Sequence, residues 1–351
     1  MANIVNYINH FANIPMSDMA FNDIDNVILS CISYIDYTGI FEGPTTLGEL
    51  AEKYFNSNSK KDINAQVIAV RSAAKLLRYI KDEVRYKDLL IHDYEYVYND
   101  EEQFAAMCID LDDKTTYISF EGTDELVSGW KEDFEFSYKF PVPSQKDAIK
   151  YVNKHIKLFD KRNYILGGHS KGGHLALVAG MYLNRFKHRH VISIISNDGP
   201  GLRDKEFFSR KYRRILPKYN LILTDQSIVG MLLYEHENPT VIKSNKKGIM
   251  AHDVLSWETK GNEFIPAELS KFSKNMDEKL FEWLERYSYD EREKFVKNLF
   301  AVLERADIDS LLDIKENKIT SVIKIIKETR GLSKETKDMI KTLIQFVINI
   351  K

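Results

Sequence analysis

The spacing of hydrophobic positions along the chain changes from helical to strand-like and back. In residues 22–36 and 64–82, apolar side chains recur at helical spacing, so both segments are predicted to be amphipathic helices. Thr46 and Glu49 stand three positions apart before an apolar stretch, the arrangement of a capping box. This pair predicts the start of a short helix between the two longer ones.

Three short segments then follow a different pattern. Residues 93–98, 103–110 and 115–120 are rich in aromatic and β-branched side chains, with Asn-Asp and Asp-Asp-Lys turns between them. They predict an antiparallel meander that leads into a larger sheet.

From residue 144 onward, strand-like and helix-like segments alternate. Alternation of this kind is typical of a mainly parallel sheet with helices on both faces. The predicted fold class is therefore α/β, with N-terminal helices in front of it. The predicted strands are 163–167, 190–196, 220–224 and 239–244, and the predicted helices are 144–159, 171–186 and 226–234.

After Trp257 the chain has helical spacing almost to its end. We expect one large domain over residues 1–260 and a helical extension over residues 261–351, with the boundary between Gly261 and Pro266. The extension is expected to pack on the first domain; a lid over an apolar cleft and a membrane-surface helix are the alternatives. The predicted helices are 267–287, 289–305, 317–329 and 333–350, with Phe281, Trp283, Leu284, Phe295, Leu299 and Leu303 as anchors.

Composition narrows the class of protein. The net charge of −2 gives no reason to expect a nucleic-acid partner, and no run approaches the ~18 apolar residues of a membrane span. Cys31 and Cys108 lie in apolar runs and are predicted to be buried free thiols, not a disulfide or a metal site. The N-terminus lacks the pattern of a signal peptide, so a cytoplasmic location is expected. No cofactor is expected.

The pentapeptide from Gly168 to Gly172 reads G-x-S-x-G, with Ser170 at its centre. It lies between a predicted strand and a predicted helix, which is the context of a nucleophile elbow. In an elbow a sharp turn exposes the serine hydroxyl, and the amide of the next residue, Lys171, lies at the positive end of a helix. That amide is a candidate oxyanion donor.

A serine nucleophile needs a general base, and His252 is the favoured candidate. Of the nine histidines, His236 and His252 lie beyond the later strands. His252 sits in a loop after the last strand, where a base can reach the serine. His236 stands in a polar turn and is interpreted as solvated, and the side chain of His169 is expected to point away from the cleft.

Two aspartates compete for the role of the acid that orients this base. Asp225 ends the predicted strand 220–224, and Asp198 ends the strand before it, inside a Gly-Pro-Gly turn. Aspartate in such a turn often caps its own backbone, so Asp225 is preferred, Asp198 is the alternative, and Asp253 comes third. Asp225 has its own competing role as a helix cap.

The second oxyanion donor is expected in the loop after the strand 115–120. Gly122 permits a close backbone approach there, and Thr123 offers both an amide and a hydroxyl. Trp130 and Asp133 follow soon after and are candidates to brace the loop, with core packing and helix capping as their alternative roles.

Together these motifs resemble fungal-type (class 3) lipases of the α/β-hydrolase superfamily. Phe120-Glu-Gly-Thr123, Trp130 with Asp133, and the elbow stand where those lipases have F-R-G-T, W, D and G-H-S-x-G. The chain is still more similar to a bacterial lipase-like family that shares Asn197-Asp-Gly-Pro-Gly201, Ser227-Ile-Val-Gly-Met231 and His252-Asp…Trp257. Glu121 replaces the usual arginine, so any ion pair of that arginine is not carried over.

The resemblance covers roughly residues 1–257 and implies an α/β-hydrolase fold. Asp225-Gln-Ser-Ile-Val229 matches the D-x-V phrase of the class 3 acid only loosely, with two extra residues. The implied activity is hydrolysis of acyl or lipid-type esters through a Ser170–His252–Asp225 triad and an acyl-enzyme, with peripheral membrane contact as an option. The alternatives are a thioesterase or peptidase with the same triad, and a non-catalytic interaction module that uses the helical tail.

Overall fold

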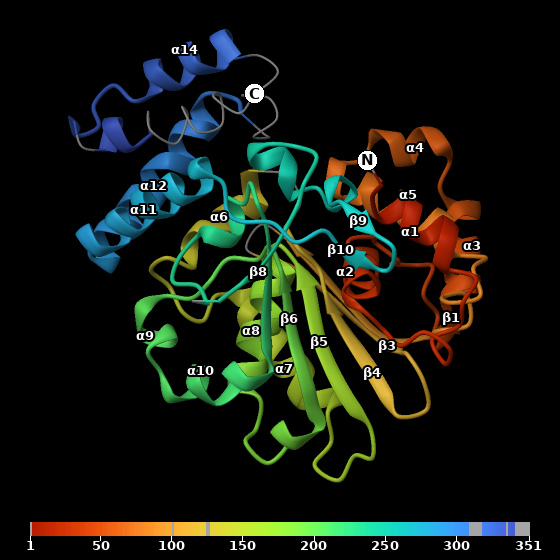
Figure 1. Ribbon diagram of the computed structural model, residues 1–351. Helices are drawn as coiled ribbons and strands as arrows, with labels where there is room; N and C mark the ends of the chain where they lie inside the picture. Colours follow the sequence, from red (N-terminus) through yellow and green to blue (C-terminus); the bar gives the residue numbers. More distant parts are fainter. Residues whose placement is uncertain are drawn as a thin grey trace.

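A sheet of eight strands in the order β1 to β8 forms the centre of the described structure (Figure 1). The structure is a computed structural model of the 351-residue chain and describes residues 2–99, 102–123, 127–236, 238–308, 318–334 and 336–340. The first four strands are antiparallel and β4 to β8 are parallel. They are β1 (Thr45–Thr46), β2 (Leu90–Asn99), β3 (Glu102–Asp110), β4 (Thr115–Phe120), β5 (Asn163–His169), β6 (Val191–Asn197), β7 (Tyr219–Thr224) and β8 (Thr240–Ile242).

Five helices near the N-terminus cover one face of the sheet. Their apolar side chains form one core with Ile165, Ile195 and Ile222, which face this side of β5, β6 and β7. A buried ion pair of Arg85 Nη2 with Asp25 Oδ2, at 2.5 Å, joins the segment after α5 to α2. The helices are α1 (Ile4–Phe11), α2 (Asp23–Ile32), α3 (Leu47–Ser57), α4 (Lys60–Ala65) and α5 (Ile68–Ile80).

The opposite face is covered by α7 and α8 in the centre. The neighbouring strand residues Leu166, Ile194 and Leu221 face this side and form a second core with those helices. The alternation of side chains along β5, β6 and β7 thus buries both faces, as expected of a parallel sheet. The helices are α7 (Pro143–His155), α8 (Lys171–Tyr182), α9 (Asp204–Phe207) and α10 (Arg210–Ile215), with short 3-10 turns η1 (His188–His190) and η2 (Leu216–Lys218).

The C-terminal helices lie at the end of the sheet where the parallel strands finish (Figure 1, blue). There α12 contacts α6, which follows β4, and α11 contacts the turn η3, which follows β7. The ring of Phe134 in α6 packs edge-on against Phe300 in α12, with 5.6 Å between centroids. These elements are α6 (Val127–Glu135), α11 (Lys271–Arg286), α12 (Tyr289–Arg305), α14 (Lys318–Glu328) and η3 (Val229–Met231).

The α/β fold class is confirmed, with an eight-stranded sheet that is parallel from β4 to β8, N-terminal helices and a helical C-terminal extension. The antiparallel meander and the capping box of Thr46 with Glu49 are also as predicted. Predicted residues 341–350 of the last helix lie outside the described residues. Within the described chain, no helix is long and apolar enough to cross a membrane.

Two expectations about local structure are wrong. Residues 226–234 do not form a helix; the described turn there is only η3, because the segment folds around Asp198 and a Cβ on Gly230 would lie 2.7 Å from the Asp198 carboxylate. Phe281 is not a buried anchor, since it is 46% exposed. The other predicted anchors Leu284, Phe295, Leu299 and Leu303 are buried, and Trp283 packs partly buried against them.

The predicted boundary at Gly261 to Pro266 falls in a segment that is tied to the sheet. A hairpin of β9 (Thr259–Lys260) and β10 (Glu263–Phe264) occupies it. Beyond the hairpin, the Ala267 amide donates to Val241 and the Ser270 amide donates to Asp225, each to the backbone carbonyl. The division into residues 1–260 and 261–351 stays a prediction.

Candidate active site

Ser170 occupies a strained turn between β5 and α8. Its backbone has φ +57° and ψ −131°, a region that residues other than glycine rarely adopt. Gly168 and Gly172 make the turn possible: a Cβ on Gly168 would lie 2.2 Å from the carbonyl carbon of Gly172, and one on Gly172 would lie 2.1 Å from the carbonyl oxygen of Phe120. The turn at Ser170 is therefore a nucleophile elbow in its backbone geometry.

The neighbouring strand β6 holds this elbow in place. The Ser170 amide donates to the carbonyl of Asn197 at 2.9 Å, and Asn197 Nδ2 donates back to the carbonyl of Gly168 at 3.1 Å. Asn26 from α2 orients the Asn197 side chain through a 2.7 Å hydrogen bond. His169 and Asn197 are register partners, so Ser170 and Asp198 begin adjacent loops at the ends of β5 and β6.

His252 makes its ring contact with Asp198. The Nδ1 atom of His252 lies 2.7 Å from Oδ2 of Asp198, whose side chain is fully buried. The second carboxylate oxygen, Oδ1, accepts a hydrogen bond from the hydroxyl of Ser227. Asp198 itself has a positive φ of +52°, which turns the chain sharply after β6. Asp198 and Ser227 together fix the ring of a histidine that arrives from the turn η4 (Gly248–His252).

The preference for Asp225 as the partner of His252 is corrected by this geometry. The carboxylate of Asp225 accepts from the backbone amide of Ser244 at 3.0 Å and from the side chain of Gln226 at 3.3 Å. Asp225 ends β7, one strand farther from the elbow than Asp198, because β6 lies between β5 and β7. The carboxylate therefore ties together the ends of β7 and β8 and does not reach His252.

Asp253, the third candidate, also has another role. Its carboxylate caps the turn η5 (Val254–Ser256) by accepting from the Leu255 amide at 3.2 Å, and it accepts from the Ser72 hydroxyl at 3.3 Å. Burial raises the pKa of Asp253 above its ordinary value. His236 packs its ring against Tyr219, with 5.6 Å between centroids.

His169 supports the loop that carries His252. Its Nε2 lies 2.9 Å from the carbonyl oxygen of His252, and its Nδ1 lies 2.8 Å from the hydroxyl of Tyr34. Burial, reinforced by the neighbouring His252, holds the pKa of His169 well below its ordinary value, so the ring is neutral. Since a carbonyl only accepts, Nε2 carries the proton and Nδ1 accepts from Tyr34.

Thr123 and Lys171 are the residues whose backbone amides are expected to bind an oxyanion. Thr123 follows β4, and Lys171 opens α8 directly after Ser170. Within the described structure, neither backbone amide donates a hydrogen bond to a protein acceptor. Both amides are thus available for an oxyanion, and the Lys171 amide has the added field of the α8 N-terminus.

The side chain of Lys171 is a buried cation beneath this site. Its Nζ donates to the carbonyl of Gln103 at 2.7 Å and to Oε2 of Glu132 at 3.3 Å. Burial lowers the pKa of Lys171, but the carboxylates of Glu132, Asp133 and Glu121 together outweigh burial and raise it. The ammonium group thereby compensates acidic side chains on both sides of the Thr123 loop.

Asp133 holds the Thr123 side chain. The Thr123 hydroxyl donates to Asp133 Oδ2 at 2.7 Å, which agrees with the expected bracing role of Asp133. Burial raises the pKa of Asp133 to about 7, although Lys171 and Thr123 oppose that rise. Among the described residues Asp133 Oδ1 has no hydrogen-bond partner, and neither has Nε1 of the half-buried Trp130. Ser170 is only 5% exposed, so the site is covered in this conformation.

One group of side chains has the spacing of metal ligands, and it lies away from this site. His92, Asp93 and Cys108 on β2 and β3 have candidate ligand atoms within 4.8 Å of one another. The Cys108 thiol is buried against the hydroxyl of Tyr151, and burial raises its pKa to about 12, which disfavours the thiolate that a metal needs. The Asp93 carboxylate is already paired with His92 and His155, at 2.7 and 3.2 Å.

Cys31 and Cys108 are both free and buried, as predicted.

Sequence reasoning missed several supporting residues of the site. Ser227 lies in the motif Ser227–Met231, for which the sequence predicts no role, and its hydroxyl donates to the Asp198 carboxylate. The supports from Tyr34, Asn26 and Glu132 come from segments far away in the chain, and no local pattern marks them. His169 was expected to point away from the cleft, and its ring does not contact Asp198 but supports the backbone of His252.

Comparisons with known proteins place these residues in a family. The model of the Mbeg1-like family matches residues 80–301, more than half of the chain, and this span includes Thr123, Ser170, Asp198 and His252. No curated protein matches the chain.

Three solved lipase structures show a weak likeness. The native lipase–propeptide complex of Rhizomucor miehei is 15% identical over 48% of this chain and 58% of its own, with a TM-score of 0.32. The M37 lipase is 15% identical over 70% and 81%, with a TM-score of 0.35. A fungal lipase–inhibitor complex is 13% identical over 78% and 96%, with a TM-score of 0.37. These scores are too low to carry an argument about function, whereas the family match spans the elbow and both its partner loops: the chain belongs to the Mbeg1-like family.

Proposed function

We propose that the protein is a serine hydrolase that cleaves carboxylic esters of the acyl or lipid type. The observation that carries this proposal is the strained Ser170 elbow at the end of β5, beside Asp198 at the end of the adjacent strand β6, whose carboxylate contacts the His252 ring. A serine, a buried carboxylate and a histidine in this order along the chain are the elements of a catalytic triad.

In the proposed reaction, Ser170 Oγ attacks the ester carbonyl carbon and passes its proton to His252 Nε2. The Asp198 carboxylate accepts from Nδ1–H, which fixes the tautomer and stabilises the imidazolium. The amides of Thr123 and Lys171 donate to the oxyanion of the tetrahedral intermediate. Collapse breaks the bond to the alcohol oxygen, which takes the proton from Nε2 and leaves the acyl group on Ser170.

Water then completes the cycle. His252 Nε2 removes a proton from a water molecule, whose oxygen attacks the acyl-enzyme carbonyl. The second tetrahedral intermediate releases the carboxylic acid, and Ser170 recovers its proton from the imidazolium. The same three side chains thus serve acylation and deacylation.

The test is labelling with a fluorophosphonate probe, which reacts with an activated serine. We expect covalent labelling of the wild type at Ser170, no labelling of Ser170→Ala, and hydrolysis of nitrophenyl esters by the wild type only. Loss of the nucleophile should lower kcat by on the order of 10⁴-fold or more. A folded wild type that is neither labelled nor active on esters would contradict the proposal and favour an interaction module.

A further inference from the structure

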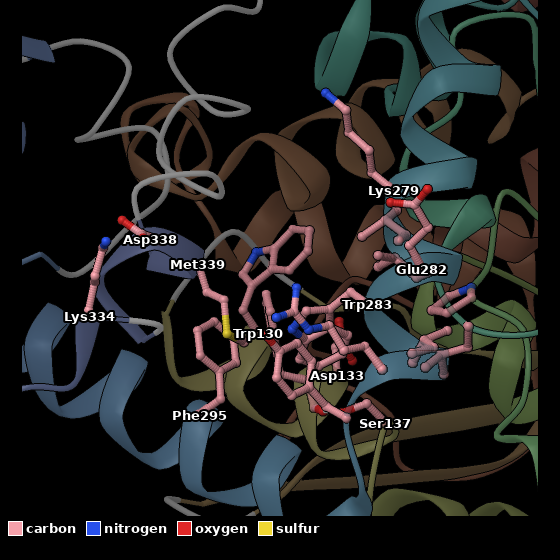
Figure 2. Close-up of a pocket in the computed structure, with 18 residues that line it drawn as sticks. Trp130, Asp133, Ser137, Lys279, Glu282, Trp283, Phe295, Lys334, Asp338 and Met339 are labelled. Atoms are coloured by element: carbon pink, nitrogen blue, oxygen red, sulfur yellow. The ribbon is translucent and has the colours of Figure 1, made fainter.

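A large cavity lies between α6 and the C-terminal helices. Its volume is about 800 Å³, within the usual range of small-molecule sites. Figure 2 shows its lining, to which α6 contributes Trp130, α11 contributes Trp283 and α12 contributes Phe295. Met339 from the segment after α14 lines it as well. The C-terminal extension therefore builds a large part of the wall.

Two residues that neighbour the proposed catalytic residues line the cavity. Asp133 is one of the residues that line it, and the Asp133 carboxylate accepts from the Thr123 hydroxyl at 2.7 Å. Pro200 lines it too, and this residue stands two positions after Asp198. Through Asp133 the cavity therefore adjoins the loop that carries Thr123.

The lining is chiefly apolar, with charged side chains from the C-terminal helices among it. Leu233, Leu280, Trp283 and Phe295 present hydrocarbon and aromatic surface, while Lys279 and Glu282 belong to the same lining. Figure 2 shows Lys279 and Glu282 together on one side and Phe295 with Met339 on another. A cavity of this composition suits a long hydrocarbon chain better than a polar group.

A strained residue contributes to this wall. Leu233 has φ +71°, in the left-handed region, which is a genuine outlier for a bulky side chain. Such strain persists only where the surrounding structure enforces it, and it concentrates at ligand sites. Leu233 follows η3, and Ser227, whose hydroxyl donates to the Asp198 carboxylate, precedes η3. The segment 227–233 thus both supports the proposed acid and lines the cavity.

We infer that this cavity holds the hydrocarbon chain of the acyl group, and that the C-terminal helices are part of the substrate site. The inference rests on the proposed ester hydrolase function and specifies its substrate class as long-chain acyl esters. The acyl side is favoured over the alcohol side because the alcohol must leave next to His252 Nε2. None of the cavity-lining residues comes from η4, the turn that carries His252, whereas Asp133 joins the cavity to the oxyanion loop.

The experiment fills the cavity and measures chain-length preference. In Leu280→Trp a bulkier ring occupies the cavity, and Phe272→Trp is the matched control on the same helix, because Phe272 is 38% exposed and does not line the cavity. The readout is the ratio of kcat/KM for nitrophenyl laurate to that for nitrophenyl acetate. We expect this ratio to fall at least about tenfold in Leu280→Trp, through KM for the laurate, and to stay at the wild-type value in Phe272→Trp.

A binding measurement keeps the inference separate from the proposed reaction. Ser170→Ala should bind laurate in a calorimetric titration, and adding Leu280→Trp should weaken that binding at least about tenfold, whereas adding Phe272→Trp should not. An unchanged ester ratio together with unchanged laurate binding would overturn the inference. If the wild type hydrolyses neither ester, the proposed function fails while laurate binding still decides the role of the cavity. Leu280→Phe replaces Leu280→Trp if the larger ring lowers Tm.

Discussion

His169 Nε2 donates a 2.9 Å hydrogen bond to the carbonyl oxygen of His252, so the residue before the candidate nucleophile holds the backbone of the candidate base. The two rings lie with 4.4 Å between their centroids. Because His169 directly precedes Ser170, any movement of the elbow is passed to the loop of His252. The strained serine and its proposed base are therefore positioned as one unit.

Loss of this hydrogen bond should lower turnover without removing a reacting group. His169→Phe keeps an aromatic ring but has no donor for the His252 carbonyl, so the base is less well placed and kcat should fall by up to about 10²-fold. His169→Gln retains a side-chain donor and should recover part of the loss. Ester kinetics with Tm for both variants test this role. Equal kcat for wild type and His169→Phe would show that the contact does not position the base.

The acid is tested by a matched pair of substitutions. Asp198→Asn keeps the side-chain shape but removes the charge opposite His252 Nδ1, so kcat should fall by about 10⁴-fold. Asp225→Asn retains an oxygen that accepts from the Ser244 amide, so its ester turnover should stay near that of the wild type. Kinetics of the two variants at the same pH measure the difference. A larger loss in Asp225→Asn would restore Asp225 as the acid.

Asp133 should make the folded state less stable as the pH rises. Burial raises its pKa to about 7 in the folded protein, from the ordinary value of 3.8, so the folded state retains a proton that the unfolded state has lost. Between these two values the free energy of unfolding contributed by Asp133 therefore decreases with increasing pH. The stabilising contribution is fully present below pH 3.8 and is lost as the pH rises through about 7.

Asp133→Asn removes this titration and keeps an acceptor for the Thr123 hydroxyl. Urea unfolding at several pH values should show a smaller decline in the free energy of unfolding between pH 4 and 7 for Asp133→Asn than for the wild type. If both proteins show the same decline, the Asp133 carboxylate does not titrate in this range.

The C-terminal helices should be integral to the folded protein. Leu299 in α12 is buried, so Leu299→Ala should lower the free energy of unfolding by about 2–5 kcal/mol through lost burial and a cavity. Ile323 in α14 is 62% exposed, and Ile323→Ala should change it by less than about 0.5 kcal/mol. Denaturant unfolding of the two variants gives both values.

Truncation at Gly261 tests the same point on the whole extension. It would remove Arg292, whose Nη1 donates to the carbonyl of Ser137 at 2.7 Å, and would expose the apolar residues that α12 covers in α6. We expect insoluble or destabilised protein. A soluble, fully active fragment 1–260 with an unchanged Tm would show that the extension is dispensable.

The sequence alone identified the candidate elbow and the proposed base because both depend on local order along the chain. A G-x-S-x-G pentapeptide between a strand and a helix carries its own steric requirement at Gly168 and Gly172. His252 was identified because few histidines follow the later strands, and its loop position needed no knowledge of packing. Hydrophobic spacing likewise predicted the parallel strands and the helices that cover them, since burial on two faces imposes a period.

Only the tertiary structure distinguished Asp198 from Asp225. Each aspartate follows a strand of the same parallel sheet, so the local sequence does not tell which of them contacts His252. That contact depends on which strand lies next to β5 and on where η4 folds back over the sheet. Packing also explains why the segment 226–234 contains the turn η3 and not the expected helix. The chain there passes within contact distance of the Asp198 carboxylate. Phe281 is exposed while Leu284 in the same helix is buried, because only one side of α11 packs against neighbouring elements.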